Sequence, residues 1–412
     1  SIIPDENNDW INKKDKSFNN YIPLYSKDKN ERKTIFDIVS SGIVTGIDSK
    51  FYNFSKINLR NNINEMINFY EQERNLKEKN INYVIQYDIK KIVWNDVFSR
   101  NIKNNVKLPL FDYNNCGIGL YRPFVKQYIY YVPSILHRSY QQNKLFNNIN
   151  CENKVICITG LGSSKNYSCI ISKNIPDSGL NSACQCLPYY WYEETDANLF
   201  GENFIRHDGV TNYILEKTIK KYNNAKITKE MIFNYVYGFL HSKEFKLKYE
   251  NNLKKEITRI PLVDTYEMFW AFSEAGKKLA NLHLNYEQIK PYSKCKIFMY
   301  PGADYKVRKM KFGKSKNNNK DKTIIEYNAK ITISNIPEKA YEYIVNGKSA
   351  IEWIMERYAV TVDKKSGIEN DPNDWCKEVN DEKYIFNLLL RIINVSIQTV
   401  DIVNSLPKID FD

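Results

Sequence analysis

The amino-acid sequence predicts an α+β fold: a body with mixed or antiparallel strands, then a helical subdomain and a helical C-terminal region. Short runs rich in β-branched and aromatic residues, bounded by glycine, serine and proline, concentrate between residues 118 and 205. Apolar residues recur at helical spacing from 208 to 290 and again toward the C-terminus. At 412 residues the chain is long enough for two or three cores that need no disulfides.

The first expected region, residues 1–117, mixes short extended pieces with one clear helix from about Lys56 to Asn80. The apolar residues at helical spacing in that helix are Ile63, Met66, Ile67 and Tyr70. The chain starts at a serine, with neither an initiator methionine nor a targeting signal. We therefore expect it to be a piece of a longer polypeptide.

The second expected region, residues 118–300, starts with strands. The stretch YRPFVKQYIYY (121–131) favours pleated structure, because aromatic and β-branched residues suit a half-buried sheet. Two further runs, KVICITG (154–160) and SCIISKNIP (168–176), are typical of short strands. The small-residue loop between them carries Lys165.

Helices are expected in the rest of this region. Asp208 is predicted to cap a helix over 208–222, and Thr228 to cap one over 228–249. A capping-box pattern at Asp264–Glu267 predicts the start of a third helix. The apolar stripes of these helices are most simply core positions.

The third expected region, residues 301–412, combines a basic β-hairpin segment with an acidic helical C-terminal part. A lysine-rich polar loop precedes the hairpin, which is predicted over 323–334 with its turn near Asn328-Ala329. A long apolar stripe from Ile385 to Leu406 predicts a C-terminal helix that packs against another surface.

The stretch VNGKSA (345–350) resembles the end of a phosphate-binding loop. The full pattern GxxxxGK[ST] requires glycine at the position of Glu342, where a carboxylate would repel phosphate. Gly347 is instead expected to end one helix, and Ser349 to start the next in a capping box with Glu352.

Charge is distributed unevenly along the chain, whose net charge is +12. Basic side chains outnumber acidic ones by 7 to 1 over residues 121–175, by 11 to 5 over 212–260 and by 8 to 2 over 301–322. Residues 337–412 carry 9 basic and 14 acidic side chains. A basic body with an acidic tail indicates a polyanion such as nucleic acid as the partner.

The eight cysteines indicate reduced thiols, and we expect no metal site. Cys184-Gln-Cys186 is their one tight pair, and its spacing is poor for structural zinc. No apolar run approaches the roughly 20 residues of a membrane span, so a soluble, cytoplasmic protein is expected.

No complete active site is apparent in the sequence. TGLGSS (159–164) lacks the third glycine of a dinucleotide loop and predicts a turn, which could cradle one phosphate. Pro4-Asp5 with Glu31–Lys33 matches a nuclease pattern formally, but without the apolar strand that this pattern requires. The four histidines show no metal or triad spacing and are expected to be structural.

Recognition of nucleic acid is the chemistry that remains. Basic residues interleaved with aromatics suit it, because cations neutralise phosphates while flat rings stack on bases. The residues predicted to contact DNA on this ground are Arg122, Lys126, Tyr128, Lys165, Lys306, Arg308, Lys309 and Lys311. Ser163 and Ser164 are predicted to contact it with Lys165 through the phosphate-cradling turn.

Five long stretches occur in a fixed order over nearly the whole chain. They are YRPFVKQYIYY, KVICITGLGSSKNYSCIISKNIPD, CQCLPYYWYEE, IFNYVYGFLHS with RIPLV, and YEYIVNGKSAIEWIMERYAV with SGIENDPNDW. Together they resemble the C-terminal region of single-polypeptide, ATP-dependent restriction-modification enzymes of type ISP and related helicase-methyltransferases.

The resemblance implies a target recognition domain that follows nuclease, helicase-like, coupler and adenine-N6 methyltransferase domains of one polypeptide. Residues 1–117 would then link the methyltransferase to the recognition body. SSGIVTGIDSKFYNF (40–54) is similar to the segment that follows the catalytic domain in many adenine methyltransferases. On that resemblance Gly42, Thr45 and Gly46 would form a tight turn near the DNA backbone.

No NPPY or NPPF tetrapeptide, glycine-rich S-adenosylmethionine loop or helicase phosphate loop occurs in the chain. The resemblance therefore places S-adenosylmethionine, ATP and Mg²⁺ in upstream domains and implies no cofactor here. The leading hypothesis is a duplex DNA recognition module of a bacterial phage-defence enzyme. Two alternatives stay open: a coupling module that binds other domains of the same machine, and a stand-alone nuclease.

Overall fold

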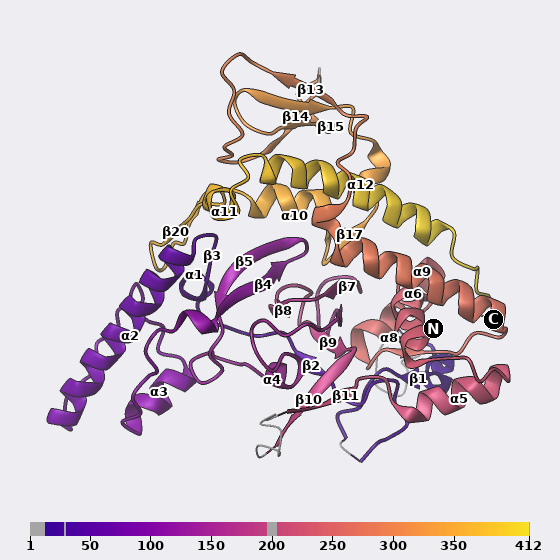
Figure 1. The fold of residues 1–412 in the computed structure, drawn as a ribbon, viewed down its shortest axis with the longest axis horizontal. Coiled ribbons are helices and arrows are strands. Elements are labelled where there is room, and N and C mark those ends of the chain that lie inside the picture. Colours follow the sequence, from indigo (N-terminus) through magenta and orange to yellow (C-terminus); the bar gives the residue numbers. More distant parts are fainter. Residues whose placement is uncertain (1–12, 29, 196–203, 316, 412) are drawn as a thin grey trace, which may run out of the picture.

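The computed structural model describes residues 13–28, 30–195, 204–315 and 317–411 (Figure 1). It is an α+β fold, as the sequence predicted, with small sheets in the middle and helices around them. The Pro4-Asp5 pair lies outside the described residues.

Two four-stranded sheets form the centre of the molecule. The first contains, in spatial order, β3 (Tyr52–Asn53), β5 (Val125–Tyr130), β4 (Cys116–Arg122) and β8 (Ile175–Pro176). The second contains β2 (Ser40–Ser41), β9 (Gln185–Pro188), β6 (Val155–Ile158) and β7 (Cys169–Ser172). All pairs are antiparallel except β4 with β8. The strand predicted over 154–160 is present as β6, and the run 168–176 contains β7 and β8. Residues 121–131 hold the end of β4, a turn at 123–124 and β5 in place of one strand.

Four two-stranded antiparallel ribbons are present in addition to the four-stranded sheets. They pair β1 (Ile22–Pro23) with β12 (Arg259–Ile260), β10 (Tyr190–Glu194) with β11 (Phe204–Asp208), β17 (Ile344–Val345) with β18 (Lys348–Ser349), and β19 (Thr361–Val362) with β20 (Glu369–Asn370). Gly347 and Asn346 have positive φ values of 81° and 49° in the tight turn between β17 and β18. The prediction that Gly347 ends a helix is therefore wrong: it closes a hairpin.

Most predicted helices are present, with changes at their ends. The helices of the first 300 residues are α1 (Asp48–Phe51), α2 (Lys56–Lys79), α3 (Asp96–Lys103), α4 (Gln142–Leu145), α5 (Asn212–Tyr222), α6 (Lys229–Phe239), α7 (Lys243–Lys248), α8 (Glu250–Lys255) and α9 (Tyr266–Leu284). Thr228 caps α6 as predicted, but α6 stops at Phe239 instead of continuing to 249. The caps of α5 and α9 are Thr211 and Thr265, since Asp208 belongs to strand β11.

The C-terminal third consists of a projecting sheet and three helices, seen at the top of Figure 1. The sheet contains β13 (Lys296–Met299), β16 (Ile331–Ser334), β15 (Lys320–Glu326) and β14 (Lys311–Lys314), in that order, and its β15–β16 hairpin confirms the predicted one. The helices are α10 (Ala350–Arg357), α11 (Asn373–Glu378) and α12 (Tyr384–Asn404). Ser349 and Glu352 form the predicted capping box at the start of α10.

Among the described residues α12 alone is long and apolar enough to cross a membrane. Most of its apolar window is buried against the rest of the protein, as in the core helix of a globular fold. Its residues Ile385, Leu388, Ile392 and Val395 are each 0% exposed. The predicted apolar stripe is thus covered from within the chain.

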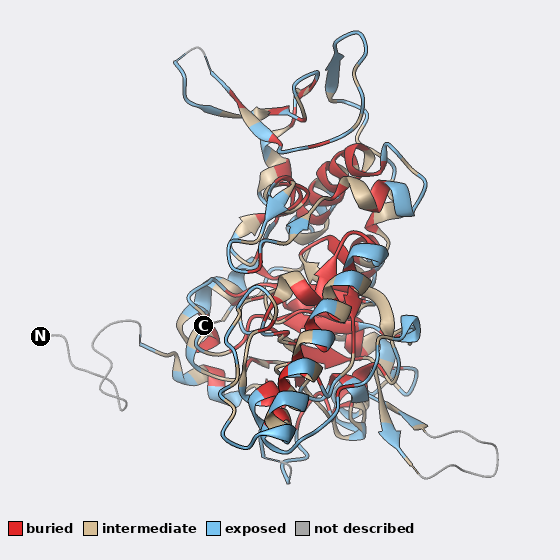
Figure 2. Cartoon of the chain, turned by 90° about the vertical axis from the view of Figure 1, so that its left-hand side faces the viewer, coloured by how far each residue is buried: buried red, intermediate tan, exposed pale blue. Residues whose placement is uncertain are grey.

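Two apolar cores cut across the three regions expected from the sequence, and buried residues fill the middle of the molecule in Figure 2. One core joins α2, the β3–β5–β4–β8 sheet and the C-terminal helices. The other joins the helical subdomain to the N-terminal segment, where Lys14 pairs with Glu256 at 2.8 Å and β1 pairs with β12. Residues 14–36 therefore pack with the helices of 208–290, not with the rest of 1–117.

Candidate nucleic-acid interface

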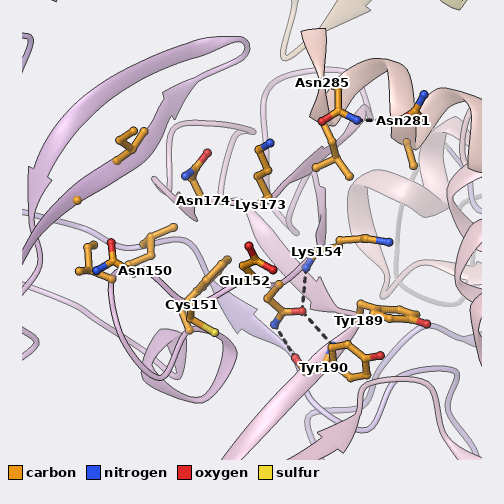
Figure 3. A pocket seen from close by; sticks show the side chains of 18 of the residues that line it. Asn150, Cys151, Glu152, Lys154, Lys173, Asn174, Tyr189, Tyr190, Asn281 and Asn285 are labelled. Carbon is orange, nitrogen blue, oxygen red and sulfur yellow. Dashed lines mark hydrogen bonds between the residues drawn. The ribbon is translucent and has the colours of Figure 1, made fainter. Parts of the chain in front are cut away.

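An open groove with a volume of about 1160 Å³ separates the central strands from helix α9 (Figure 3). One wall is formed by β4 with Tyr128 of β5 and the loop 149–154. The turn between β7 and β8 contributes Lys173 and Asn174, while the start of β10 and the C-terminal half of α9 complete the opposite side. Segments far apart in the sequence thus meet at one surface.

Five basic side chains line this groove: Lys56, Lys154, Lys173, Arg206 and Lys277. All five residues are exposed, and none has a carboxylate within 4.0 Å among the residues that the structure describes. The groove lining carries two acidic residues, Glu152 and Glu230. Unneutralised cations in a concave surface give it a positive potential that attracts a polyanion.

Three of these cations lie over tyrosine rings at the edge of the groove. Lys56 is 4.9 Å from the centroid of Tyr128, and Lys154 is 5.3 Å from that of Tyr189. The guanidinium of Arg206 lies 4.3 Å from the ring of Tyr190. A cation held over a ring keeps its charge available while its side chain loses freedom before any ligand binds.

Asparagine amides supply the polar groups of the groove. Asn150, Asn174, Asn281 and Asn285 line it together with the lysines. The Asn285 side chain donates from Nδ2 to Asn281 Oδ1 at 2.8 Å, so the two amides form one unit at the end of α9. Amide groups can donate to and accept from base edges, whereas lysines contact phosphates.

Asn153 fixes the loop that carries Lys154. It is 5% exposed, and its Nδ2 donates to the carbonyl oxygens of Leu145 and Tyr190, each at 2.7 Å. Its Oδ1 accepts from the backbone nitrogens of Lys154 at 2.8 Å and Tyr190 at 3.1 Å. One buried amide therefore joins the loop to strand β10 and sets the position of the groove wall.

Of the residues predicted from the sequence, Tyr128 alone lines this groove. It is 7% exposed and packs on Trp375, with ring centroids 4.8 Å apart. Lys126, in the same strand, is 8% exposed and forms an ion pair with Glu287. These surroundings give Lys126 a structural partner in place of a phosphate and leave Tyr128 mainly a core residue.

Arg122 also has partners inside the fold. Its side chain is 14% exposed and lies 2.7 Å from Asp177 and 3.4 Å from Asp48. The guanidinium is stacked 3.8 Å from the ring centroid of Tyr121. Two carboxylates and a ring already occupy this group, which argues against a phosphate contact.

The turn containing Gly42, Thr45 and Gly46 is tight, as the resemblance implied. Thr45 is 1% exposed and donates to Asp48 at the start of α1. Gly46 has a φ of +83°, while a Cβ at Gly42 would meet the backbone of Asp177 at 2.7 Å. The local geometry explains the two glycines by close packing and by positive φ, and the threonine by its hydrogen bond to the Asp48 carboxylate.

The glycine loop after β6 lies on the surface. Ser163 Oγ accepts from the backbone nitrogen of Lys165 at 2.9 Å, so the loop is closed by its own serine. Ser164 and Lys165 are exposed, and the Lys165 side chain passes next to Gly347. The loop remains a candidate for a single phosphate contact, separate from the groove.

Lys306, Arg308, Lys309 and Lys311 lie between β13 and the start of β14, and all four are exposed. None of them has a carboxylate within 4.0 Å in the described part of the chain. They form a second basic surface on the projecting sheet, outside the groove.

A thiol cluster is the one group in the described residues with a metal-like arrangement. The sulfurs of Cys157, Cys184 and Cys186 lie within 4.8 Å of one another, with Cys157 brought in by strand β6. The three residues are 0% exposed in the apolar core. Burial raises the pKa of Cys157 and Cys186, whereas hydrogen bonds from the Cys157 and Cys186 thiols lower the pKa of Cys184.

Most groove residues were not among the predicted sites. Lys154 and Lys173 belong to the basic segment 121–175, which did point to this surface. Lys277, Asn281 and Asn285 recur every four residues along the polar side of α9 and its C-cap. The prediction for this helix used its capping-box pattern and its apolar stripe and left these polar positions out. No sequence pattern brings Lys56 and Arg206 to the same site.

The profile of the Type ISP C-terminal specificity domain matches residues 34–388. The structure of a nuclease-deletion mutant of the Type ISP enzyme LlaGI with a DNA substrate mimic is 36% identical, with a TM-score of 0.85, over 100% of this chain. DNA-bound LlaBIII is 34% identical over 100% of this chain with a TM-score of 0.88, and the DrdV–DNA complex is 25% identical over 98% with a TM-score of 0.83.

This chain spans 36% of the LlaGI chain, 26% of the LlaBIII chain and 40% of the DrdV chain. No curated protein matches the sequence. The match of the family profile begins between β1 and β2, ends in the second turn of α12 and includes every wall of the groove. The chain belongs to the family of Type ISP C-terminal specificity domains.

Proposed function

We propose that this chain is the module that recognises a duplex DNA target, and that the groove beside α9 is its main contact surface. The observation that carries the proposal is the set of five cations without a carboxylate partner among the described residues, which share one groove with the amides of Asn150, Asn174, Asn281 and Asn285. Lysine and arginine would hold phosphates, and the amides would read base edges. The solved LlaGI, LlaBIII and DrdV structures contain DNA, which supports the same assignment.

The parent polypeptide would supply the chemistry. In this proposal an adenine-specific methyltransferase and an ATP-dependent nuclease precede the chain and use S-adenosylmethionine, ATP and Mg²⁺, while the specificity domain itself has no catalytic site. The polypeptide would act on DNA in the bacterial cytoplasm. Methylation or cleavage of DNA by the 412-residue chain alone would contradict this division of labour.

The test is a titration of fluorescein-labelled duplex DNA at several salt concentrations, followed by anisotropy. The variant Lys154→Gln/Lys173→Gln/Lys277→Gln should bind more weakly than the wild type at every salt concentration. Log affinity falls linearly with log salt concentration, and each lost phosphate contact makes this negative slope shallower by about 0.9. Loss of three contacts therefore makes it shallower by up to about 2.7. A slope equal to that of the wild type would refute the groove as the phosphate-binding surface.

A matched control removes three positive charges elsewhere. Lys79, Lys103 and Lys107 are exposed near the far end of α2 and α3, and none has a carboxylate within 4.0 Å among the described residues. The control Lys79→Gln/Lys103→Gln/Lys107→Gln should keep the wild-type slope. Equal losses in both triple variants would mean that net charge alone, and no defined groove, attracts the DNA.

The coupling-module alternative depended on an apolar C-terminal stripe that needed a partner. That stripe is buried within this chain, with Leu389 and Ile393 both 0% exposed. The stand-alone nuclease alternative relied on Glu31–Lys33, which lies in an exposed turn where Glu31 Oε1 accepts from the backbone nitrogen of Lys33. Neither arrangement favours these functions over DNA recognition.

A further inference from the structure

In the projecting sheet β13–β16–β15–β14, strand β16 packs one face on the core, whereas all four residues of the edge strand β13 are exposed. Side chains alternate across a strand, so Ile297 and Met299 of β13 face the same way as their register partners Ile333 and Ile331. Ile331 and Ile333 are 0% exposed and belong to the core that contains α12. The other face carries Phe298, next to Thr332.

The solvent face presents two aromatic rings side by side. Phe298 and Tyr300 are each 56% exposed, with ring centroids 4.8 Å apart and ring planes at 89°. Their spacing of two residues places both rings on the same face of the strand. Contiguous exposed aromatic side chains are typical of binding surfaces, whereas single exposed apolar residues are common on any protein.

Lysines flank these two rings. Lys296 precedes Phe298 by two residues on the same face, and it pairs in register with Ser334. The Lys330 carbonyl oxygen accepts from the backbone nitrogen of Tyr300 at 2.9 Å, and Lys330 Nζ donates to the carbonyl oxygen of Gly302 at 3.0 Å, two residues beyond Tyr300. The solvent face therefore carries two rings between two lysines, and the neighbouring strand β16 adds the hydroxyl groups of Thr332 and Ser334.

The charge of the sheet selects the class of partner. Residues 294–334 carry 11 basic and 3 acidic side chains. This excess of positive charge favours an anionic partner over a neutral or apolar protein surface. Exposed rings need a partner with flat apolar faces. Nucleic acid with unstacked bases provides both, whereas the bases of intact duplex DNA are stacked on each other and hide their faces.

We propose that this sheet face binds single-stranded DNA, with bases stacked on Phe298 and Tyr300 and phosphates held by Lys296 and Lys330. Aromatic residues on an exposed sheet face form such stacking platforms in single-strand-binding folds. The proposal rests on the proposed DNA-binding function but adds a second surface with a different ligand state. Duplex DNA occupies the groove beside α9, and a displaced or unpaired strand occupies the sheet.

The experiment compares the wild-type chain with the variant Phe298→Ala/Tyr300→Ala, using fluorescein-labelled oligothymidylate and a labelled duplex in parallel. Both side chains are more than half exposed, so the variant should fold normally, which a thermal melt verifies. Affinity for oligothymidylate should fall by at least roughly 5- to 160-fold, the loss expected for a single stacked base, and by more where each ring holds a base. Affinity for the duplex should stay within about twofold.

Two controls separate stacking from a general surface effect. The variant Tyr300→Phe keeps the ring and should retain wild-type affinity for oligothymidylate. The variant Tyr87→Ala removes a ring that is 80% exposed in another part of the molecule, and it should change neither affinity.

Three outcomes would overturn the proposal. They are a wild-type chain that fails to bind oligothymidylate, equal losses for oligothymidylate and duplex in the double variant, and unchanged affinities in that variant. The last result would point to another protein domain as the partner of this face. Failure of the proposed duplex function would be seen in a different measurement. In that case the groove variant Lys154→Gln/Lys173→Gln/Lys277→Gln would bind the labelled duplex with the wild-type salt slope, whatever the result with oligothymidylate.

Discussion

Arg122 Nη1 lies 2.7 Å from Asp177 Oδ1, and this pair joins the end of β4 to the segment that follows β8. Asp177 is 3% exposed and also accepts from the backbone nitrogen of Gly179 at 2.8 Å. Burial raises the pKa of the Asp177 carboxyl to about 7, and the guanidinium opposes that rise. The arginine that the sequence suggested for DNA contact therefore compensates a buried carboxyl group.

The variant Arg122→Gln should reduce the free energy of unfolding, with little direct effect on the DNA affinity of the folded chain. Removing one partner of a buried pair leaves the other uncompensated and costs roughly 3–5 kcal/mol of unfolding free energy. Urea denaturation measures that loss, while Arg308→Gln, at an exposed position, should change stability by less than about 0.5 kcal/mol. A stable Arg122→Gln chain with weak DNA binding would restore the original prediction of a phosphate contact.

Asn281 and Asn285 should determine part of the DNA sequence preference. Their mutual bond uses Asn281 Oδ1 and Asn285 Nδ2, so together the pair still presents Asn281 Nδ2 as a donor and Asn285 Oδ1 as an acceptor. Adenine offers the matching acceptor and donor in the major groove. Loss of this contact costs about 1–3 kcal/mol for the preferred sequence and nothing for others.

Selection from a randomised duplex pool with the wild type and with Asn281→Ala/Asn285→Ala checks this prediction. The variant should give a relaxed preference at one position with an unchanged salt slope. Gln288→Ala serves as the control, since this exposed amide lies outside the groove lining. Identical selected sequences and affinities for wild type and variant would exclude base reading by this pair.

The fold should lose stability as the pH falls below about 6.5, because two histidines are buried in their neutral form. Burial lowers the pKa of His241 to about 3 and that of His283 well below its usual value. His283 bridges the Tyr237 hydroxyl at 2.6 Å and the Thr399 hydroxyl at 2.9 Å, while His241 Nδ1 lies 2.7 Å from the Tyr237 carbonyl oxygen. The unfolded chain binds protons from about pH 6.5 and the folded chain only at lower pH.

Each buried histidine then contributes about 1.4 kcal/mol of lost stability per pH unit below 6.5. Urea denaturation between pH 8 and pH 5 measures the profile. His241→Gln should flatten it even though that variant is less stable at neutral pH. A profile equally steep in His241→Gln would show that carboxylates, and not this histidine, control acid unfolding.

The sequence was sufficient for elements whose signals are local. The stripe in α12, the hairpin over 323–334 and the Ser349 capping box need only neighbouring residues, and each is present. Asp208 misled as a helix cap because its role depends on pairing with Tyr190, 18 positions earlier, in the β10–β11 ribbon.

Sequence patterns do not show where a charge has a distant partner. A local pattern shows that Arg122 and Lys126 are basic, but not that Asp177 and Glu287 neutralise them across the fold. The same limit hid the groove, since Lys56 and Lys277 are 221 positions apart and meet only after folding. Charge counts therefore predicted the class of partner and the basic segments, while the tertiary fold decided which cations remain available.

Gly276 of α9 and Gly238 of α6 let these two helices touch through their backbones. A Cβ at Gly276 would overlap the carbonyl oxygen of Asn234, and one at Gly238 would overlap that of Phe272. Backbone atoms cannot rotate away as a side chain can, so any larger residue must separate the helices. Since α9 carries Lys277, Asn281 and Asn285, this close approach also places one wall of the groove.

The variant Gly276→Ala should therefore destabilise the protein, although alanine is the better helix former by about 1 kcal/mol. Overpacking typically costs about 1–3 kcal/mol, and a clash with backbone belongs to the upper part of that range, so a net loss of about 1–2 kcal/mol is expected in urea denaturation. Duplex affinity should fall as well, because α9 must move away from the strands that form the other wall. The control Lys278→Ala changes an exposed residue on the same helix and should alter neither quantity measurably. An increase in stability of about 1 kcal/mol in Gly276→Ala would show that helix propensity dominates and that α6 and α9 can separate at no cost.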